Sequence, residues 1–182
     1  MQGQVKPVSA VFIMNKNKKI LLYGYGNPGR QDDGLGNQFV EKFRQIAAQK
    51  NLQNIHFDSN YQLNIEDAEV LTNYDYVIFA DATIDGDIEK FLLTKVDGKR
   101  EVSFTSHSAS PSYLYMLAND LFGNAPETYL MHIRGYEFEF LEGLTQEAQA
   151  NLEASVKFLE EILHAPELLA KNAVIYEAST LS

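Results

Sequence analysis

Three side chains suited to binding a divalent metal ion occur where the sequence passes from one structural element to the next. Asp33 follows an apolar run and a glycine-rich turn, Asp81 ends a second apolar run, and His107 lies in a serine-rich loop. Two carboxylates and one imidazole form a donor set for divalent nickel, zinc, manganese or iron. Three protein ligands leave coordination positions open for water or a substrate atom, which is typical of catalytic metal sites.

The elements that must position these residues alternate between strand and helix patterns. This alternation predicts an α/β protein with a single-domain three-layer fold, in which a mostly parallel twisted sheet is flanked by helices on both faces. Sites in such sheets lie at the carboxyl ends of the strands, where neighbouring strands are about 5 Å apart. The three ligands are therefore expected to meet there. The expected strands are 19–25, 54–58, 76–80, 91–96 and 127–133, and the expected helices are 34–50, 64–71, 111–121 and 146–163.

Composition narrows the chemistry and the partners. The chain has 182 residues, which suits one domain, and its formal net charge is −10. Proteins that bind nucleic acid usually present a basic face, so the charge weighs against such a partner. There is no cysteine, which excludes disulfides, thiolate metal sites and cysteine-protease chemistry. Any metal must be held by nitrogen and oxygen ligands.

The two ends of the chain differ from the middle. The apolar run 8–14 has its main positive charge after it rather than before it, and it is too short to cross a bilayer. We therefore expect a cytoplasmic protein with no membrane partner. The predicted organisation is an N-terminal extension at 1–18, a domain at 19–164 and a loosely held C-terminal tail at 165–182.

The loop after the first strand carries the most informative motif. Residues 24–29 read Gly-Tyr-Gly-Asn-Pro-Gly, and Arg-Gln-Asp-Asp-Gly-Leu-Gly follows at 30–36. The glycines permit tight turns with positive φ, and Asn27 suits an Asx turn. We expect Asp32 to cap the following helix, which leaves Asp33 free to act as a ligand.

This motif and the two later ligands resemble the maturation endopeptidases of nickel-iron hydrogenases. That family has a Gly-x-Gly-Asn loop followed by Asp-Asp/Glu-Gly, an aspartate after a strand, and a histidine in a serine-rich loop. Asp33, Asp81 and His107 match these three metal-binding positions, and the resemblance implies that they also form the catalytic site. It places Gly26 and Asn27 in the loop that faces the substrate, and it extends from about residue 19 to residue 163.

The resemblance implies a peptidase that removes the C-terminal extension of the hydrogenase large-subunit precursor after nickel insertion. The metal would be nickel carried by the substrate, and cadmium or zinc would occupy the same site in vitro. A bound divalent ion can polarise the scissile carbonyl or lower the pKa of an attacking water. A carboxylate base such as Asp33 is the other possible driving group, and the sequence does not choose between them.

Two other functions share part of the pattern. Peptidyl-tRNA hydrolases also carry Gly-x-Gly-Asn-Pro-Gly, but their catalytic asparagine and histidine follow in a segment that this chain lacks. A non-catalytic α/β module could use the glycine-rich loop to bind a nucleotide or another protein. Asp32 and Asp33 would repel phosphate, however, which weighs against a nucleotide ligand.

Overall fold

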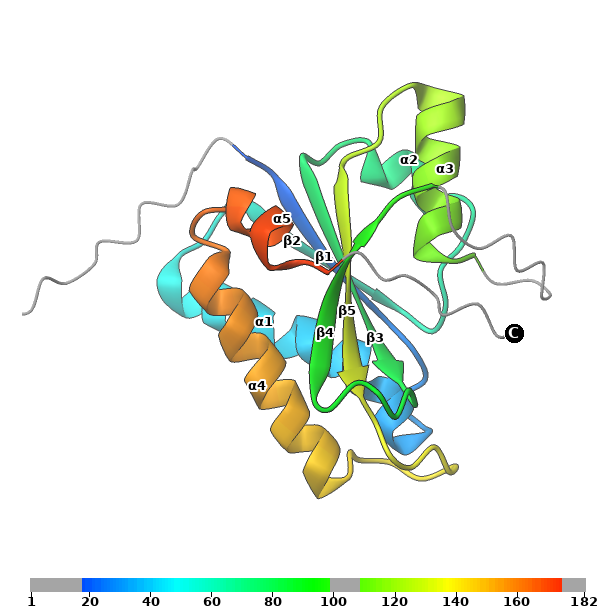
Figure 1. Ribbon diagram of the computed structural model, residues 1–182, viewed down its shortest axis with the longest axis vertical. Coiled ribbons are helices and arrows are strands. Elements are labelled where there is room, and N and C mark those ends of the chain that lie inside the picture. The colour runs from blue at the N-terminus through cyan, green and yellow to red at the C-terminus, as the bar shows by residue number, and fades with distance from the viewer. Residues whose placement is uncertain (1–17, 99–108, 175–182) are drawn as a thin grey trace, which may run out of the picture.

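The computed structural model describes residues 18–98 and 109–174, which form one α/β unit (Figure 1). Strands and helices alternate along most of the chain, as the hydrophobic pattern predicts. The strands are β1 (Ile20–Tyr25), β2 (Ile55–Asn60), β3 (Tyr76–Thr83), β4 (Phe91–Val96) and β5 (Glu127–Arg134). The helices are the 3₁₀ segment η1 (Gln31–Gly34), α1 (Leu35–Lys50), α2 (Asp67–Leu71), α3 (Pro111–Phe122), α4 (Gln146–Ile162) and α5 (Glu167–Asn172).

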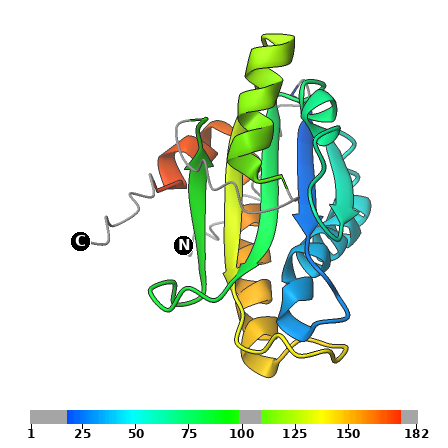
Figure 2. The ribbon, with the colours of Figure 1, turned by 90° about the vertical axis from the view of Figure 1, so that its right-hand side faces the viewer.

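The strands of the described residues form one five-stranded sheet with the order β2-β1-β3-β5-β4. Strands β2, β1, β3 and β5 are parallel, and β4 pairs with β5 in the antiparallel direction. The prediction of a mostly parallel sheet is therefore confirmed. The carboxyl ends of β1, β3 and β5 lie at the same edge, at the bottom of Figures 1 and 2.

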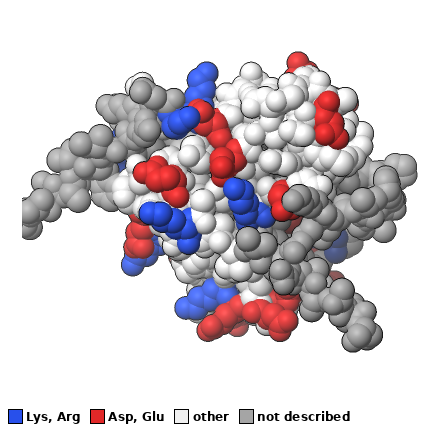
Figure 3. Space-filling model, turned by 45° about the horizontal axis from the view of Figure 1, so that its top comes forward, with Lys and Arg blue, Asp and Glu red and all other residues white. Residues whose placement is uncertain are grey.

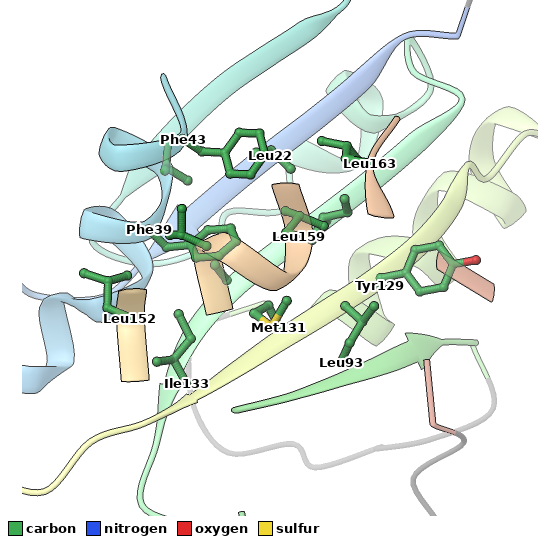
Figure 4. Packing of buried hydrophobic residues seen from close by; sticks show 14 of the residues in the cluster. Leu22, Phe39, Phe43, Leu93, Tyr129, Met131, Ile133, Leu152, Leu159 and Leu163 are labelled. Atoms are coloured by element: carbon green, nitrogen blue, oxygen red, sulfur yellow. The ribbon is translucent and has the colours of Figure 1, made fainter. Parts of the chain in front are cut away.

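Helices cover both faces of the sheet, which confirms the predicted three layers. On one face, α1, α4 and α5 pack against the sheet, and Figure 4 shows Phe39 and Leu159 meeting side chains from the strands. On the other face, the short α2 and α3 cover a smaller cluster that includes Tyr23 and Phe79. The central strands are apolar on both faces because both faces are buried.

Helix α1 starts unusually close to the ends of β1 and β3, and glycines make this possible. A Cβ atom on Gly24 would lie 2.0 Å from the carbonyl oxygen of Gly36. A Cβ atom on Gly36 would lie 2.2 Å from the carbonyl oxygen of Ala80 and 2.6 Å from that of Tyr25. The two glycines therefore allow η1 and the start of α1 to lie directly on the carboxyl edge of the sheet.

We expect Gly36→Ala to lower the free energy of unfolding by about 3 kcal/mol, because backbone atoms block the new methyl group and α1 must shift. Urea unfolding followed by circular dichroism measures this. Gly86→Ala is the matched control, since its Cβ would meet only the Arg134 Nη1 atom at 3.8 Å. Equal stability of the two variants would contradict the close packing described above.

Three details differ from the sequence-based predictions. Asp81 lies inside β3, which continues to Thr83, rather than directly after the strand. Helix α2 begins at Asp67, three residues later than the expected helix 64–71, and the Asp67 carboxylate accepts the Asn64 N–H at 2.8 Å. Residues of the predicted loose tail pack into the core, because α5 forms and Leu169 is fully buried. Among the described helices, none has the length and apolar character needed to cross a membrane.

Candidate metal and catalytic site

Asp33 and Asp81 are brought to the same edge of the sheet by different elements. Asp33 lies in η1, which follows the β1 loop and rests on the ends of β1 and β3. Asp81 lies near the end of β3, where its side chain shares the face of Phe79 because alternate residues of a strand point to the same side. Both carboxylates are partly buried. The parallel topology predicts this shared edge, and the role of the two carboxylates as ligands stays a prediction.

The environment of Asp81 opposes its ionisation. The pKa of Asp81 is raised to about 7, chiefly by burial and to a smaller extent by the negative charge of Asp33, although hydrogen bonds from the Tyr25 hydroxyl and the Ala82 N–H act in the opposite direction. The charge of Asp33 acts on this pKa in the direction expected for two carboxylates at one edge of the sheet. Two carboxylates that repel each other in a partly dry site form a favourable position for a cation.

Tyr25 is a contributor that the sequence analysis did not single out. It is the last residue of β1, and its hydroxyl donates a hydrogen bond to Asp81 from the neighbouring strand. Its ring packs edge-on against Phe79 with the centroids 6.4 Å apart. The sequence feature that could have indicated this role is the spacing of Tyr25 from the buried Tyr23. The two residues are two positions apart, which places both rings on one face of β1.

His107, the third predicted ligand, lies outside the described residues. The chain enters the described structure again at Ala109, which forms an antiparallel bridge with Leu63. Leu63 follows β2 at the carboxyl edge, and it packs in the cluster on the face that carries Asp81. The residue two positions after His107 therefore lies on the same face and at the same edge as Asp81.

Within the described ranges, no group of three or more His, Cys, Asp and Glu side chains is close enough to hold a metal ion. Asp33 and Asp81 are two members of the predicted set of three, and that set stays a prediction. Both are oxygen donors, as a hard or borderline divalent ion requires. The ion pairs found among the described residues involve neither of them.

The loop of Gly26 and Asn27 is braced against Asp33. The Asn27 N–H donates to Asp33 Oδ2 at 3.1 Å, and Asn27 Oδ1 accepts the Gly29 N–H at 2.9 Å as in an Asx turn. Gly26 has a φ of 139°, and a Cβ atom on it would lie 2.0 Å from the Asp33 carbonyl oxygen. The loop therefore positions the carboxylate of Asp33, and a role in substrate contact remains a prediction.

Asp32 does not cap the following helix, so that prediction is wrong. Neither η1 nor α1 has a side-chain cap, and Asp32 is fully buried. Its carboxylate accepts hydrogen bonds from the N–H groups of Tyr136, Glu137 and Thr145 and from the Thr145 hydroxyl, at 2.7–3.1 Å. Asp32 thus joins the site to the loop between β5 and α4, a long-range contact that local motifs do not reveal.

His132 is a second residue whose position sequence reasoning missed. It lies directly opposite Asp81 in the register of β3 and β5, so the two side chains share one face. Its Nε2 atom is 3.0 Å from Thr94 Oγ1, and burial lowers its pKa to about 4. His132 is therefore a neutral imidazole at pH 7.

Comparison with solved structures defines the class of this fold. The chain has the α/β fold of the hydrogenase maturation endopeptidases, which confirms the fold expected from the resemblance. No family model matches the chain, and no curated protein does so.

Three solved structures illustrate the likeness. The hydrogenase maturating endopeptidase HybD from E. coli is 18% identical with a TM-score of 0.59, over 79% of this chain and 93% of HybD. The [NiFe] hydrogenase maturation protease HycI from Thermococcus kodakarensis KOD1 is 17% identical with a TM-score of 0.65, over 80% and 92%. The hydrogenase 2 maturation peptidase from Thaumarchaeota archaeon SCGC_AB-539-E09 is 20% identical with a TM-score of 0.58, over 80% and 98%. At these identities the likeness establishes the fold.

Proposed function

We propose that this protein is a cytoplasmic endopeptidase that removes the C-terminal extension of a nickel-iron hydrogenase large-subunit precursor after nickel insertion. The observation that carries the proposal is the placement of Asp33 and Asp81 at the same carboxyl edge of the sheet. The shared fold with hydrogenase maturation endopeptidases supports it. In this proposal Asp33, Asp81 and His107 bind the nickel that the substrate carries.

The electrostatics of the two aspartates explain how such a site would select a metal-loaded substrate. Two like charges in a partly buried position destabilise each other when no cation is present. A nickel ion already held by ligands of the precursor would relieve this repulsion. The side chains of the site would then bind at coordination positions of the nickel that the precursor leaves open. A precursor without nickel would offer no such compensation, so the metal would act as the recognition element.

The same site offers two routes to peptide hydrolysis. A divalent ion can polarise the scissile carbonyl or lower the pKa of an attacking water. Alternatively, a carboxylate can accept the proton of the water, and the Asp81 pKa of about 7 suits this role at neutral pH. In both routes Gly26 and Asn27 would keep Asp33 in place beside the substrate.

The charge of the chain also fits a protein substrate better than a nucleic acid. The chain carries a formal net charge of −10. On the face seen in Figure 3, the visible Lys and Arg side chains lie among Asp and Glu side chains rather than in one continuous basic patch. A polyanion such as tRNA would need clustered positive charge.

We expect His107→Ala and Asp33→Asn each to abolish processing of a nickel-loaded precursor, because each removes a proposed nickel ligand. Mass spectrometry measures processing as the decrease in the mass of the precursor. His56→Ala is the control, since His56 is exposed on β2, where its ring lies against the Tyr74 ring with the centroids 5.3 Å apart. Unimpaired cleavage by either site variant would overturn the assignment.

A further inference from the structure

A loop beside the site displays apolar side chains to solvent. Residues 136–142, here called the rim loop, follow β5 and read Tyr-Glu-Phe-Glu-Phe-Leu-Glu. Phe140 is 86% exposed, Leu141 is 60% exposed and Tyr136 is 45% exposed. Figures 1 and 2 show the connection between β5 and α4 at the bottom edge, next to η1. The exposed apolar surface therefore borders the segment that carries Asp33.

The rim loop is held firmly although its surface is exposed. The Gln31 N–H donates to the Leu141 carbonyl at 2.8 Å, and the Asp32 N–H donates to the Glu137 carbonyl at 3.1 Å. Arg30 Nη2 donates to the Phe138 carbonyl at 3.1 Å. These bonds run from η1 and the residue before it, so the loop and Asp33 keep one geometry.

Arg30 also supports the most exposed ring. Its guanidinium carbon lies 5.2 Å from the centroid of Phe140, within the range of a cation–π contact. The ring is thus positioned on one side and open to solvent on the other. An apolar side chain that is ordered before binding loses little conformational entropy when a partner covers it.

The charge of the rim loop indicates the kind of partner. Glu137, Glu139 and Glu142 are exposed, and the loop contains no lysine or arginine. None of the ion pairs found among the described residues involves these three glutamates. Carboxylates alternating with aromatic and aliphatic side chains complement a segment in which basic and apolar residues alternate.

We propose that the rim loop is a docking surface for a basic and apolar segment of the protein substrate, next to the bond that is cleaved. This inference rests on the proposed peptidase function and adds the chemical character of the substrate segment. A second copy of this chain is a poorer occupant, because two rim loops would bring their glutamates together and the chain is strongly acidic.

Direct binding tests the surface without relying on catalysis. The probes are two short fluorescein-labelled peptides, one in which leucine alternates with lysine and one in which leucine alternates with glutamate. The rim variant is Phe140→Ser with Leu141→Ser. The matched control is Leu121→Ser with Phe122→Ser, since these residues are 66% and 47% exposed at the end of α3, at the opposite edge of the sheet.

Fluorescence anisotropy should show that the lysine peptide binds the wild type and the control variant equally, and binds the rim variant about tenfold more weakly or worse. The glutamate peptide should not bind. Equal affinity of the lysine peptide for the rim and control variants would overturn the proposal, and so would equal binding of the two peptides. Unchanged melting temperatures of the variants confirm that the fold is intact.

Processing of the nickel-loaded precursor separates this inference from the proposed function. We expect the rim variant to have a KM about tenfold higher and a kcat close to the wild-type value. The reason is that the substitutions alter the docking surface and leave the proposed nickel ligands unchanged. If the wild type cleaves the precursor and the rim variant has the same KM, the docking surface is wrong and the peptidase function stands. If the wild type does not cleave it, the proposed function fails, and the peptide titration alone decides the rim loop.

Discussion

Asp81→Asn should raise the stability of the metal-free protein at pH 8 and at the same time abolish precursor processing. The pKa of Asp81 is raised from 3.8 to about 7 in the folded protein, chiefly by burial. The folded state therefore holds a proton on Asp81 that the unfolded state releases above about pH 4. An asparagine keeps a carbonyl oxygen for the Tyr25 hydroxyl and never ionises.

The sign of the pH dependence follows from the direction of this shift. Between about pH 4 and pH 7 the folded state binds more protons than the unfolded state, so the contribution of Asp81 to the free energy of unfolding falls as the pH rises. Above pH 7 Asp81 is ionised in the folded protein, and the burial of its charge then lowers the free energy of unfolding by the full amount. The substitution should therefore stabilise the protein by about 2 kcal/mol at pH 8 and by much less near pH 4.

Urea unfolding of the wild type and the variant at several pH values measures this difference. Asp75→Asn is a control of opposite sign, because a 2.9 Å ion pair with Lys18 lowers the pKa of Asp75. That variant should lose stability above the pKa of the unfolded aspartate and lose nothing at lower pH. A variant of Asp81 that is less stable than the wild type at pH 8 would contradict the burial of a destabilising charge.

The stability gained by this variant bears on why the aspartate is present. A residue that lowers stability and could be neutralised without repacking is more easily understood as a ligand or a proton acceptor than as part of the core. Cadmium or nickel ions should accordingly raise the melting temperature of the wild type more than that of Asp81→Asn. Equal shifts in both proteins would place the metal elsewhere.

Much of the fold could be predicted because the hydrophobic pattern is local. The continuous apolar run 76–80 indicates a strand buried on both faces, and α3 begins at Pro111, as the expected helix 111–121 does. The meeting of Asp33 and Asp81 then followed from the rule that parallel strands present their carboxyl ends at one edge. These inferences need only neighbouring residues and the strand direction.

What the sequence did not reveal depends on contacts between distant segments. Asp32 resembles a helix cap in its local context, yet its partners lie more than 100 positions away in the β5–α4 loop. The predicted loose tail instead packs through Leu169 into the core cluster that α1 and α4 form with the sheet. Hydrophobic periodicity cannot show either contact, since both arise only when the layers have assembled.

Asp32→Asn should destabilise the fold strongly, whereas the same substitution at the neighbouring Asp33 should not. Asp32 is fully buried and accepts four hydrogen bonds, three from backbone N–H groups and one from the Thr145 hydroxyl. An amide nitrogen in place of one carboxylate oxygen must face N–H donors and leaves them without an acceptor. Each buried donor without a partner costs about 1–3 kcal/mol.

The expected loss for Asp32→Asn is about 3 kcal/mol, and Asp32→Ala should lose about 4 kcal/mol because all four bonds disappear. Asp33→Asn removes the same charge one residue away, where the carboxylate is only partly buried and accepts a bond from Asn27. We therefore expect Asp33→Asn to change the urea midpoint little while it removes processing activity. Equal urea midpoints for Asp32→Asn and Asp33→Asn would show that the buried hydrogen bonds of Asp32 do not hold the rim loop. That result would contradict the fixed position of the rim loop beside Asp33.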